Sequence, residues 1–372
     1  MKQKALYIIT LIMLAASACI KPFESPKSAQ DLGFLVVDGT INIGAPTTVR
    51  LTRTKNISDD HFNTPELNAS VFIESESGQV YNFQGDSAGY YSSAGYPVSF
   101  NDKYRLKIET KSGEQVASDF VEAKQSPPID SVNWVQNNEV YIYVNTHDPS
   151  NNTRYYRWVY EETSQYQSHY DSYADFIDGQ IVYLTDEQMR YNCYKYYNST
   201  DIILGSSTAL SDDVIKNRLI NIVPNDNSKI SVRYSILVKQ FALTQEAYNY
   251  WQMLKQNSEQ TGNVFDPQPS QLVGNIHSIT DPGRPVLGYV SASSVSEQRL
   301  FIRWQDLEDR RDPQAGMRCD EKFISFEQAA EYLTDREKYR IAYFTQGAIV
   351  IARMLCVDCT LRGGTNVKPA YW

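Results

Sequence analysis

Apolar and polar residues alternate in seven short segments between residues 34 and 118, and Gly-bearing turns such as Ser77-Gly78 and Ser112-Gly113 separate them. The segments are 34–39, 47–51, 70–74, 80–83, 90–91, 104–108 and 115–118. A period of two residues is typical of strands with one buried face, and turns at this spacing favour an antiparallel sandwich. We therefore predict an immunoglobulin-like β-sandwich over residues 33–126, ending at the stiff Ser126-Pro127-Pro128 junction.

A second region of alternation follows this junction and predicts a larger β-rich domain over residues 127–372. Its strands are expected at 132–135, 140–144, 155–160, 230–238, 286–290 and 299–302. Residues 161–225 are rich in Tyr, Ser, Asn and Asp without a sustained period, so we interpret them as an irregular, tyrosine-rich insertion. The fold class predicted for the chain is mainly β, with one or two helices.

Helical spacing is clearest after Thr244, which is placed to cap a helix, and Gly262 stands where that helix would stop. Four side chains share its apolar face: Ala247, Tyr250, Trp251 and Leu254. Aromatic residues on such a stripe are expected in the core, although Tyr250 and Trp251 would also suit stacking on a sugar. A second, shorter helix is predicted over residues 326–336, with Ser325 as its cap, and 347–354 is a last apolar run.

The N-terminal residues 1–18 have the pattern of a secretory signal, with Lys2 and Lys4 before an apolar run that is too short to span a membrane. Ala16-Ser17-Ala18 places small residues directly before Cys19, which predicts a lipobox in which the Cys19 thiol is acylated after cleavage. Ala16 stands where Leu is usual, and the alternative is an ordinary signal cut near Ala18. Residues 19–32 are polar and read as a lipidated tether.

Charge limits the classes of partner. The segment 1–18 carries two of the 35 basic residues and no acidic one, so 33 basic residues face 44 acidic residues in the rest of the chain. This acidic balance argues against nucleic acid and against electrostatic adhesion to anionic lipid, so the lipid on Cys19 is expected to supply the membrane anchor. Ile20 is not the Asp that holds lipoproteins in the inner membrane, which predicts the outer membrane, with cell-surface exposure as a further option.

Four cysteines remain in the exported chain: Cys193, Cys319, Cys356 and Cys359. An even number in an oxidising compartment favours two disulfides, with three possible connectivities. A zinc site built on the C-x-x-C pair at 356–359 is the alternative, but Cys193 and Cys319 do not form a second such pair. A redox role is disfavoured because no thioredoxin-like βαβ pattern surrounds the motif.

Several short sequence segments, taken together and in order, resemble the domain-of-unknown-function 4249 family of exported lipoproteins in Bacteroidetes-type bacteria. They are Leu35-Val36-Val37-Asp38-Gly39, Pro127-Pro128-Ile129-Asp130-Ser131-Val132, Tyr155-Tyr156-Arg157-Trp158, residues 234–240 leading into 247–251, Gly274-Asn275-Ile276, Val286-Leu287-Gly288-Tyr289 and the closing 356–372. The resemblance implies association with TonB-dependent outer-membrane transporters, because members look like partners of such transporters. It implies no activity and no catalytic residue.

Catalytic patterns are absent from the sequence: the four histidines have no ligand spacing, and no nucleophile elbow or phosphate loop is found. Glu161 and Glu162 could be taken for a glycosidase pair, but neighbours on a strand point to opposite faces, so a solvated turn or a salt bridge to Arg157 is expected. Asp148 with Asn151 and Asn152 falls short of a calcium loop and favours an Asx-type turn. We expect no enzyme, no metal and no cofactor.

The chain holds 27 tyrosines, and tyrosine supplies rigid, amphipathic contact area in binding surfaces. The candidate recognition surface is the set Tyr166, Tyr170, Tyr173 and Tyr183. The predicted function is that of a non-catalytic outer-membrane lipoprotein, an accessory or substrate-binding partner of a TonB-dependent transporter with an unidentified ligand. The alternatives are a structural or adhesion lipoprotein of the envelope and, third, an extracellular hydrolase.

Overall fold

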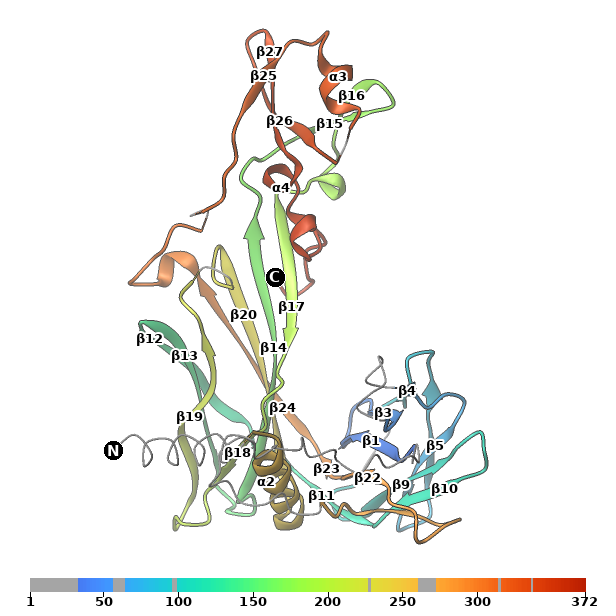
Figure 1. Cartoon of the computed structure of the whole chain (residues 1–372). Helices are drawn as coiled ribbons and strands as arrows, with labels where there is room; N and C mark the ends of the chain where they lie inside the picture. The colour runs from blue at the N-terminus through green and yellow to red at the C-terminus, as the bar shows by residue number, and fades with distance from the viewer. Residues whose placement is uncertain are drawn as a thin grey trace, which may run out of the picture.

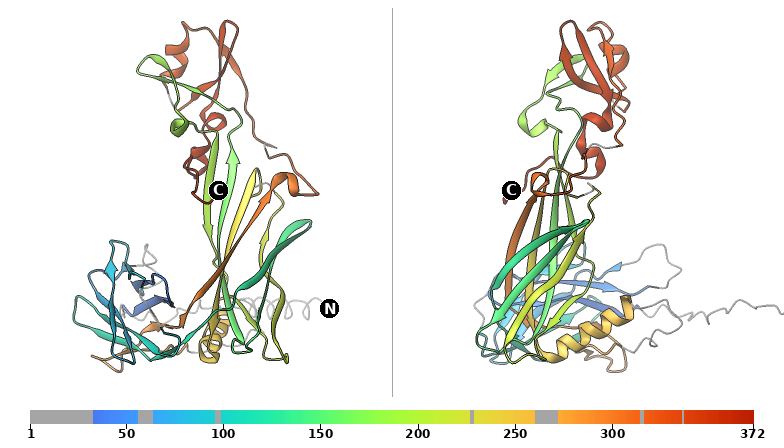
Figure 2. Two further views of the ribbon diagram at one scale, coloured as in Figure 1. Left: turned by 180° about the vertical axis from the view of Figure 1, so that it is seen from behind. Right: turned by 90° about the vertical axis from the view of Figure 1, so that its left-hand side faces the viewer.

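The computed structural model describes residues 33–55, 64–95, 99–226, 229–259, 272–313, 316–335 and 337–372. The predicted signal 1–18, the acylation site Cys19, the tether 19–32 and the predicted helix stop Gly262 lie outside the described residues. The described chain is mainly β, as predicted, and forms a first sandwich, a middle sandwich and a head (Figure 1). The head and the first sandwich lie at opposite ends of the molecule (Figures 1 and 2).

The first sandwich combines the N-terminal strands with three strands from a later part of the chain. Its strands are β1 (Leu35–Gly39), β2 (Ile41–Asn42), β3 (Thr48–Arg53), β4 (Thr64–Pro65), β5 (Ser70–Ser75), β6 (Val80–Asn82), β7 (Gln84–Gly85), β8 (Tyr90–Ser92), β9 (Lys103–Glu109), β10 (Gln115–Ser118), β11 (Val121–Lys124), β21 (Ile276–Ser278), β22 (Leu287–Gly288) and β23 (Ala292–Ser293). One sheet has the order β22-β1-β3-β8-β7, and the other β2-β23-β11-β9-β10-β21. Their inward side chains form one core, from Leu35, Leu51 and Ile73 to Leu106.

The return of residues 276–293 differs from the predicted division at residue 126. β23 lies between β2 and β11 and pairs with both in parallel, so it links strands that would otherwise be separate. β22 pairs in parallel with β1, and there a Cβ on Gly288 would lie 2.1 Å from the Val37 carbonyl oxygen. Glycine alone allows this approach. The immunoglobulin-like assignment stays a prediction.

The middle sandwich packs a three-stranded sheet against a five-stranded sheet. The first contains β12 (Ile129–Asn137), β13 (Glu139–Asp148) and β19 (Asp213–Val223); the second contains β14 (Tyr155–Gln167), β17 (Asn192–Asn198), β18 (Ile203–Ser206), β20 (Arg233–Leu243) and β24 (Val295–Arg303). Trp158, fully buried, anchors their shared core. Its Nε1 donates to Gln240 Oε1 at 2.9 Å, and Gln240 Nε2 donates to the Pro127 carbonyl at 2.8 Å, which ties the core to the proline junction.

Two of the stretches of chain that connect the two sandwiches lie side by side. One leads from β11 to β12 through Ser126, and the other leads from β23 to β24 through Ser294. Ser126 N donates to Ser294 Oγ at 2.9 Å, and Ser296 Oγ donates to the Ser126 carbonyl at 3.1 Å. The two crossings are therefore hydrogen-bonded to each other.

The stretch 161–225, predicted to be irregular, is rich in strands. β14 runs to Gln167 and pairs with β17 along its upper half, from Glu161 opposite Asn198 to Gln167 opposite Asn192. The sequence does not show the alternation of apolar and polar residues in this half of β14, because the inward positions include the polar residues Glu162 and Ser164. Hydrogen bonds allow these two side chains to be buried. These two strands carry the chain from the middle sandwich into the head (Figure 1).

The head is built from segments that lie far apart in the sequence. They are β15 (Ala174–Ile177), β16 (Gln180–Tyr183), η1 (Asp186–Gln188), β25 (Lys322–Ile324), α3 (Ala329–Leu333), β26 (Tyr339–Thr345), β27 (Ala348–Arg353), α4 (Met354–Val357) and η3 (Cys359–Arg362). The short helix η2 (Trp304–Asp306) follows β24 and lies below the head. Two disulfides fasten these segments, Cys193–Cys359 and Cys319–Cys356. The prediction of two disulfides is confirmed, with this connectivity.

The predicted helices are present with changed bounds. α2 (Gln245–Glu259) begins after Thr244, whose Oγ1 accepts from Ala247 N at 3.2 Å as expected of a cap. The second helix is only α3, which is shorter than the predicted 326–336 and starts after Gln328 instead of Ser325. Among the described residues, no helix is long and apolar enough to cross a membrane.

The last two residues return from the head to the outer face of the five-stranded sheet. Tyr371 and Thr163 share a hydrogen bond of 2.6 Å between their hydroxyls, and Trp372 Nε1 donates to Gln165 Oε1 at 3.0 Å. The guanidinium of Arg233 lies between two rings, 4.1 Å from the centroid of Phe301 and 5.2 Å from that of Trp372. The tail thus fastens the head to the sheet below it.

Candidate recognition surface

The structure divides the four predicted recognition tyrosines into two pairs. Tyr166 is buried, and its hydroxyl donates to the Cys359 carbonyl at 3.0 Å. Tyr170 is half-buried, and its hydroxyl donates to the Cys319 carbonyl at 2.9 Å. Burial, with help from the Glu321 carboxylate, raises the pKa of Tyr170 to about 12, so this hydroxyl remains a donor. These two tyrosines brace the disulfides.

Tyr173 and Tyr183 lie on the surface of the head and contact each other. Tyr183 is 71% exposed and Tyr173 44% exposed, and their rings are stacked with centroids 6.1 Å apart. Tyr173 also contacts Phe344 at 5.7 Å, and Phe344 stacks on Phe326 at 6.3 Å. We call these four residues, Tyr173, Tyr183, Phe326 and Phe344, the aromatic strip.

The aromatic strip rests on a small core of its own. The β15–β16 hairpin, the sheet β25-β27-β26 and α3 bury Phe176, Ile341 and Ile349 among other apolar side chains. Below this core, Arg340 Nη1 pairs with Asp175 Oδ2 at 2.8 Å, which links the hairpin to β26. The strip therefore belongs to a supported, disulfide-fastened element. Rigid aromatic side chains lose little conformational entropy when they bind a partner.

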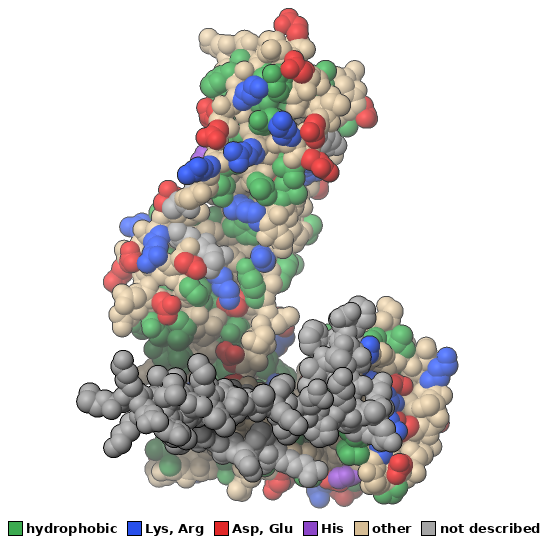
Figure 3. All heavy atoms as spheres, in the orientation of Figure 1, with side chains coloured by type: hydrophobic (Ala, Val, Ile, Leu, Met, Phe, Trp, Pro, Cys, Tyr) green, Lys and Arg blue, Asp and Glu red, His purple; other side chains and the backbone are tan. Residues whose placement is uncertain are grey.

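The aromatic strip is suited to binding a partner through contact with its rings. Exposed Phe and Tyr side chains are typical anchors of protein–protein interfaces and of sugar-stacking surfaces. Figure 3 shows apolar side chains on the head among charged side chains of both signs. In the described ranges of the chain, no group of three or more His, Cys, Asp or Glu side chains is placed to hold a metal ion.

The two neighbouring glutamates point to opposite faces of β14. Glu161 is exposed and pairs with Lys239 Nζ at 2.5 Å. Glu162 is buried, where Lys229 Nζ at 2.6 Å, Tyr234 OH at 2.6 Å and Asn221 Nδ2 at 2.9 Å donate to it. The expected opposite orientation is confirmed.

The salt bridge expected between these glutamates and Arg157 is wrong. The Arg157 guanidinium lies over the ring of Trp251 instead, 3.6 Å from its centroid. Glu161 and Glu162 are paired with the lysines on their own faces of the sheet, Lys239 and Lys229. A lysine side chain, with its four methylene groups, can reach a carboxylate from a neighbouring strand or from an adjoining loop, and the order of residues in the sequence does not specify which lysine does so.

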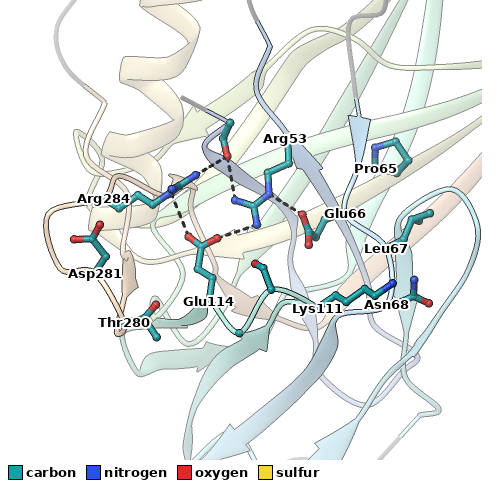
Figure 4. Close-up of a pocket in the computed structure, with 13 residues that line it drawn as sticks. Arg53, Pro65, Glu66, Leu67, Asn68, Lys111, Glu114, Thr280, Asp281 and Arg284 are labelled. Atoms are coloured by element: carbon teal, nitrogen blue, oxygen red, sulfur yellow. Dashed lines mark hydrogen bonds and ion pairs between the residues drawn. The ribbon is translucent and has the colours of Figure 1, made fainter. Parts of the chain in front are cut away.

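A second candidate is a hollow of about 920 Å³ on the first sandwich, shown in Figure 4. Arg53 pairs with Glu66 at 2.6 Å and with Glu114 at 2.8 Å. Burial alone would lower the pKa of Arg53, but hydrogen bonds to these two carboxylates raise it. The Gly33 carbonyl accepts from Arg53 at 3.0 Å and from Arg284 at 3.2 Å.

The charged groups at the centre of the hollow are therefore engaged with one another and with the backbone. Arg284, which also lies 3.6 Å from Glu114, comes from the returning segment 276–293 and fixes the first described residue, Gly33. This arrangement favours a structural role for the hollow: it holds the point at which the predicted tether would join the body. The aromatic strip is the stronger candidate for recognition.

Two residues of the strip, Phe326 and Phe344, were not predicted. Phe326 was expected to open a helix, whereas it precedes α3 and is 52% exposed. Phe344 lies on β26, far along the chain from the predicted tyrosines, although its ring contacts that of Tyr173. Phe326 beside Ser325 was the one feature of the sequence that could have indicated this part of the strip. Phe344, whose ring stacks on that of Phe326, is 18 residues away, and only the fold brings the two together.

The fold and the surface together define the class of protein: an elongated β protein with two sandwiches and a small disulfide-fastened head that bears exposed aromatic residues. The family model for a domain of unknown function, DUF4249, matches residues 20–299, and the chain belongs to this family. This confirms the family resemblance found in the sequence. No curated protein matches the chain.

Solved structures give only remote similarity. A DUF4785 family protein from Legionella pneumophila shares 8% identity at a TM-score of 0.19, covering 55% of this chain and 52% of that one. The adhesin InvE of Yersinia pseudotuberculosis shares 13% identity at a TM-score of 0.15, covering 57% and 55%. The matched part thus spans about half the length of each of these proteins.

The Asx turn at Asp148, favoured over a calcium site, gives a first prediction. Its carboxylate accepts from Ser150 N at 2.9 Å, Asn152 N at 3.0 Å and Thr153 N at 2.8 Å. Burial alone would raise the pKa of Asp148, but the hydrogen bonds from Ser150 and Thr153 together lower it. Asp148→Ala should lower the free energy of unfolding by about 1–2 kcal/mol at pH 7. Urea unfolding followed by tryptophan fluorescence measures this loss.

The pH dependence of the same variant has a defined sign. Because the folded pKa of Asp148 is depressed, its stabilisation is complete above the unfolded value of about 3.9 and is lost as pH falls through the folded pKa. The difference between wild type and Asp148→Ala should therefore shrink in acid. Asp212→Ala, at an exposed neighbouring aspartate, serves as control. A difference that persists unchanged at low pH would contradict this assignment.

Proposed function

We propose that the protein is a non-catalytic recognition protein, held at the outer membrane by a lipid on Cys19, that acts as an accessory or substrate-binding partner of a TonB-dependent transporter. The aromatic strip is its contact surface. The observation that carries this proposal is a set of contacting aromatic rings on a disulfide-fastened head, of which Tyr173, Tyr183 and Phe326 are exposed. The transporter as partner rests on the family resemblance.

The geometry of the body supports a presentation role. Gly33, where the predicted tether would join the body, lies in the first sandwich, and the head lies at the far end of the molecule (Figures 1 and 2). The tether of 14 residues would span about 20 Å as a flexible chain, from 5–6 Å times the square root of its length. A lipid on Cys19 would therefore keep the first sandwich near the membrane and present the head away from it.

The test is a mild-detergent pull-down from envelope membranes through an affinity tag, with bound proteins identified by mass spectrometry. Wild type should retain one TonB-dependent transporter in near-equal amount. Tyr183→Ala with Phe326→Ala should reduce that recovery at least 10-fold, because two exposed aromatic anchors of an interface contribute roughly 1–2 kcal/mol or more each. Both side chains are exposed, so the variant should keep its thermal unfolding midpoint.

Tyr196→Ala is the matched control. Tyr196 is an exposed tyrosine, 52% accessible, on β17 outside the aromatic strip, and its removal should leave recovery unchanged. Recovery of no transporter would reject the transporter partnership and leave the structural or adhesion role ahead. Equal recovery by the strip variant and wild type would reject the strip as the contact surface.

A further inference from the structure

A second surface, far from the head, contains two buried hydrogen-bond donors without an acceptor. Arg157 is on β14, and the central carbon of its guanidinium lies 3.6 Å from the ring centroid of Trp251 on helix α2. Arg157 Nε and Trp251 Nε1 are both buried, and neither has a hydrogen-bond acceptor in the part of the chain that the structure describes. Several other arginines have an unpaired Nε among the described residues, but here the N–H of the indole that the guanidinium contacts lacks an acceptor as well.

Acceptors hold the guanidinium groups of some other arginines. Arg53 is held by two carboxylates, Arg340 by Asp175 through Nη1, and Arg362 by the Gln167 carbonyl through Nη2. Among the described residues, no hydrogen bond or ion pair holds the Arg157 guanidinium, which contacts the face of the Trp251 indole. Burial lowers the pKa of Arg157 to about 10, yet the group stays cationic at neutral pH. The Nη atoms of Arg157 are not among the buried unpaired atoms and therefore reach the surface, where a bound acceptor would compensate the charge.

The surroundings of Arg157 restrict what that acceptor can be. Tyr250 stands edge-on to Trp251 at 5.8 Å and contacts Tyr289 of the returning segment at 5.0 Å, so the ring that the guanidinium covers belongs to a larger aromatic group. The Asp38 carboxylate on β1 lies close enough to raise the pKa of Arg157, against the larger opposing effect of burial. A nearby negative charge disfavours a multiply charged ligand such as phosphate.

We propose that this junction binds a singly charged carboxylate whose body is flat and apolar. The carboxylate would accept from the fork of Arg157, which matches carboxylate geometry, and the body would lie against Trp251 and Tyr250. The Arg157 residue as a whole is only partly buried, which leaves an approach for a small ligand. This site is independent of the aromatic strip and of the partner proposed for it.

The experiment measures the thermal unfolding midpoint with sodium acetate, sodium benzoate, acetamide or benzamide at constant ionic strength. Benzoate should raise the midpoint of the wild-type protein by at least 2 °C at 20 mM, acetate by less, and the neutral amides not at all. Arg157→Met should abolish the response to benzoate. Without ligand it should leave the midpoint unchanged or raise it, because it removes an uncompensated buried charge.

The controls separate ligand binding from a structural role. Arg50→Met removes another guanidinium that faces a ring, 5.2 Å from Tyr90, and should keep the full benzoate response. The strip variant Tyr183→Ala with Phe326→Ala should keep it too. The proposal fails if benzamide raises the midpoint as benzoate does, or if neither carboxylate shifts the midpoint of the wild-type protein. It also fails if Arg157→Met lowers the midpoint as much as Asp38→Asn does, because Asp38 would then be the acceptor for Arg157.

Discussion

Replacing Cys193 and Cys359 together by serine is expected to lower the free energy of unfolding by about 5 kcal/mol, the largest effect of any pair in the chain. The bond joins residues 166 positions apart, and the cross-link restricts the unfolded chain more as the closed loop grows. Both cysteines are fully buried between β17 and η3. Urea unfolding under non-reducing conditions measures the loss.

The second disulfide provides the internal comparison. Cys319 and Cys356 close a loop of 37 residues within the head, so their replacement should cost roughly 4 kcal/mol on the same model. The fluorescence of a probe attached to the head near residue 319 would report whether the head unfolds before the two sandwiches do. Equal or smaller losses for Cys193–Cys359 than for Cys319–Cys356 would show that strain or residual unfolded structure outweighs loop closure.

Breaking the buried pair of Glu162 and Lys229 is expected to give the second large effect. Lys229→Met should destabilise the protein by about 3–5 kcal/mol, because it leaves the Glu162 carboxylate buried without its cation. Tyr234 and Asn221 still donate to the carboxylate, and the proximity of that charge, after burial, raises the pKa of Tyr234. Chemical denaturation at pH 7 measures the change.

The double variant Lys229→Met with Glu162→Gln tests the cause. A neutral amide keeps an acceptor for Tyr234 and needs no cation, so the double variant should recover more than half of the loss. Lys239→Met, which breaks the exposed pair with Glu161, is the matched control and should cost less than about 1 kcal/mol. A double variant as unstable as Lys229→Met alone would mean that lost packing of the lysine stem is the cause.

The sequence predicted the individual strands of the first sandwich better than their assembly. The segment 70–74 became β5 (Ser70–Ser75) and 115–118 became β10, since alternation is local and each turn residue ends a strand. The parallel pairing of β1 with β22 joins residues some 250 positions apart. No local period encodes such a partner, so the division at residue 126 omitted it.

The candidate sites show the same limit. Abundant tyrosine indicated a recognition surface, and Tyr173 and Tyr183 are exposed, but Tyr166 lies on β14 where a strand was not expected. Its neighbours Glu162 and Ser164 are polar and inward, which breaks the apolar alternation without breaking the strand. Arg157 and Trp251 meet through helix packing, and their contact depends on tertiary structure alone.

The hydrogen-bonded crossings form a mechanical link between the two sandwiches. Two lengths of chain bonded through Ser126, Ser294 and Ser296 resist twisting more than one connecting chain would. The head is in turn joined to the middle sandwich by β14 and β17 and by the docked tail at Tyr371 and Trp372. A force on the head would thus reach the first sandwich through connections that act in parallel, and not through a single hinge.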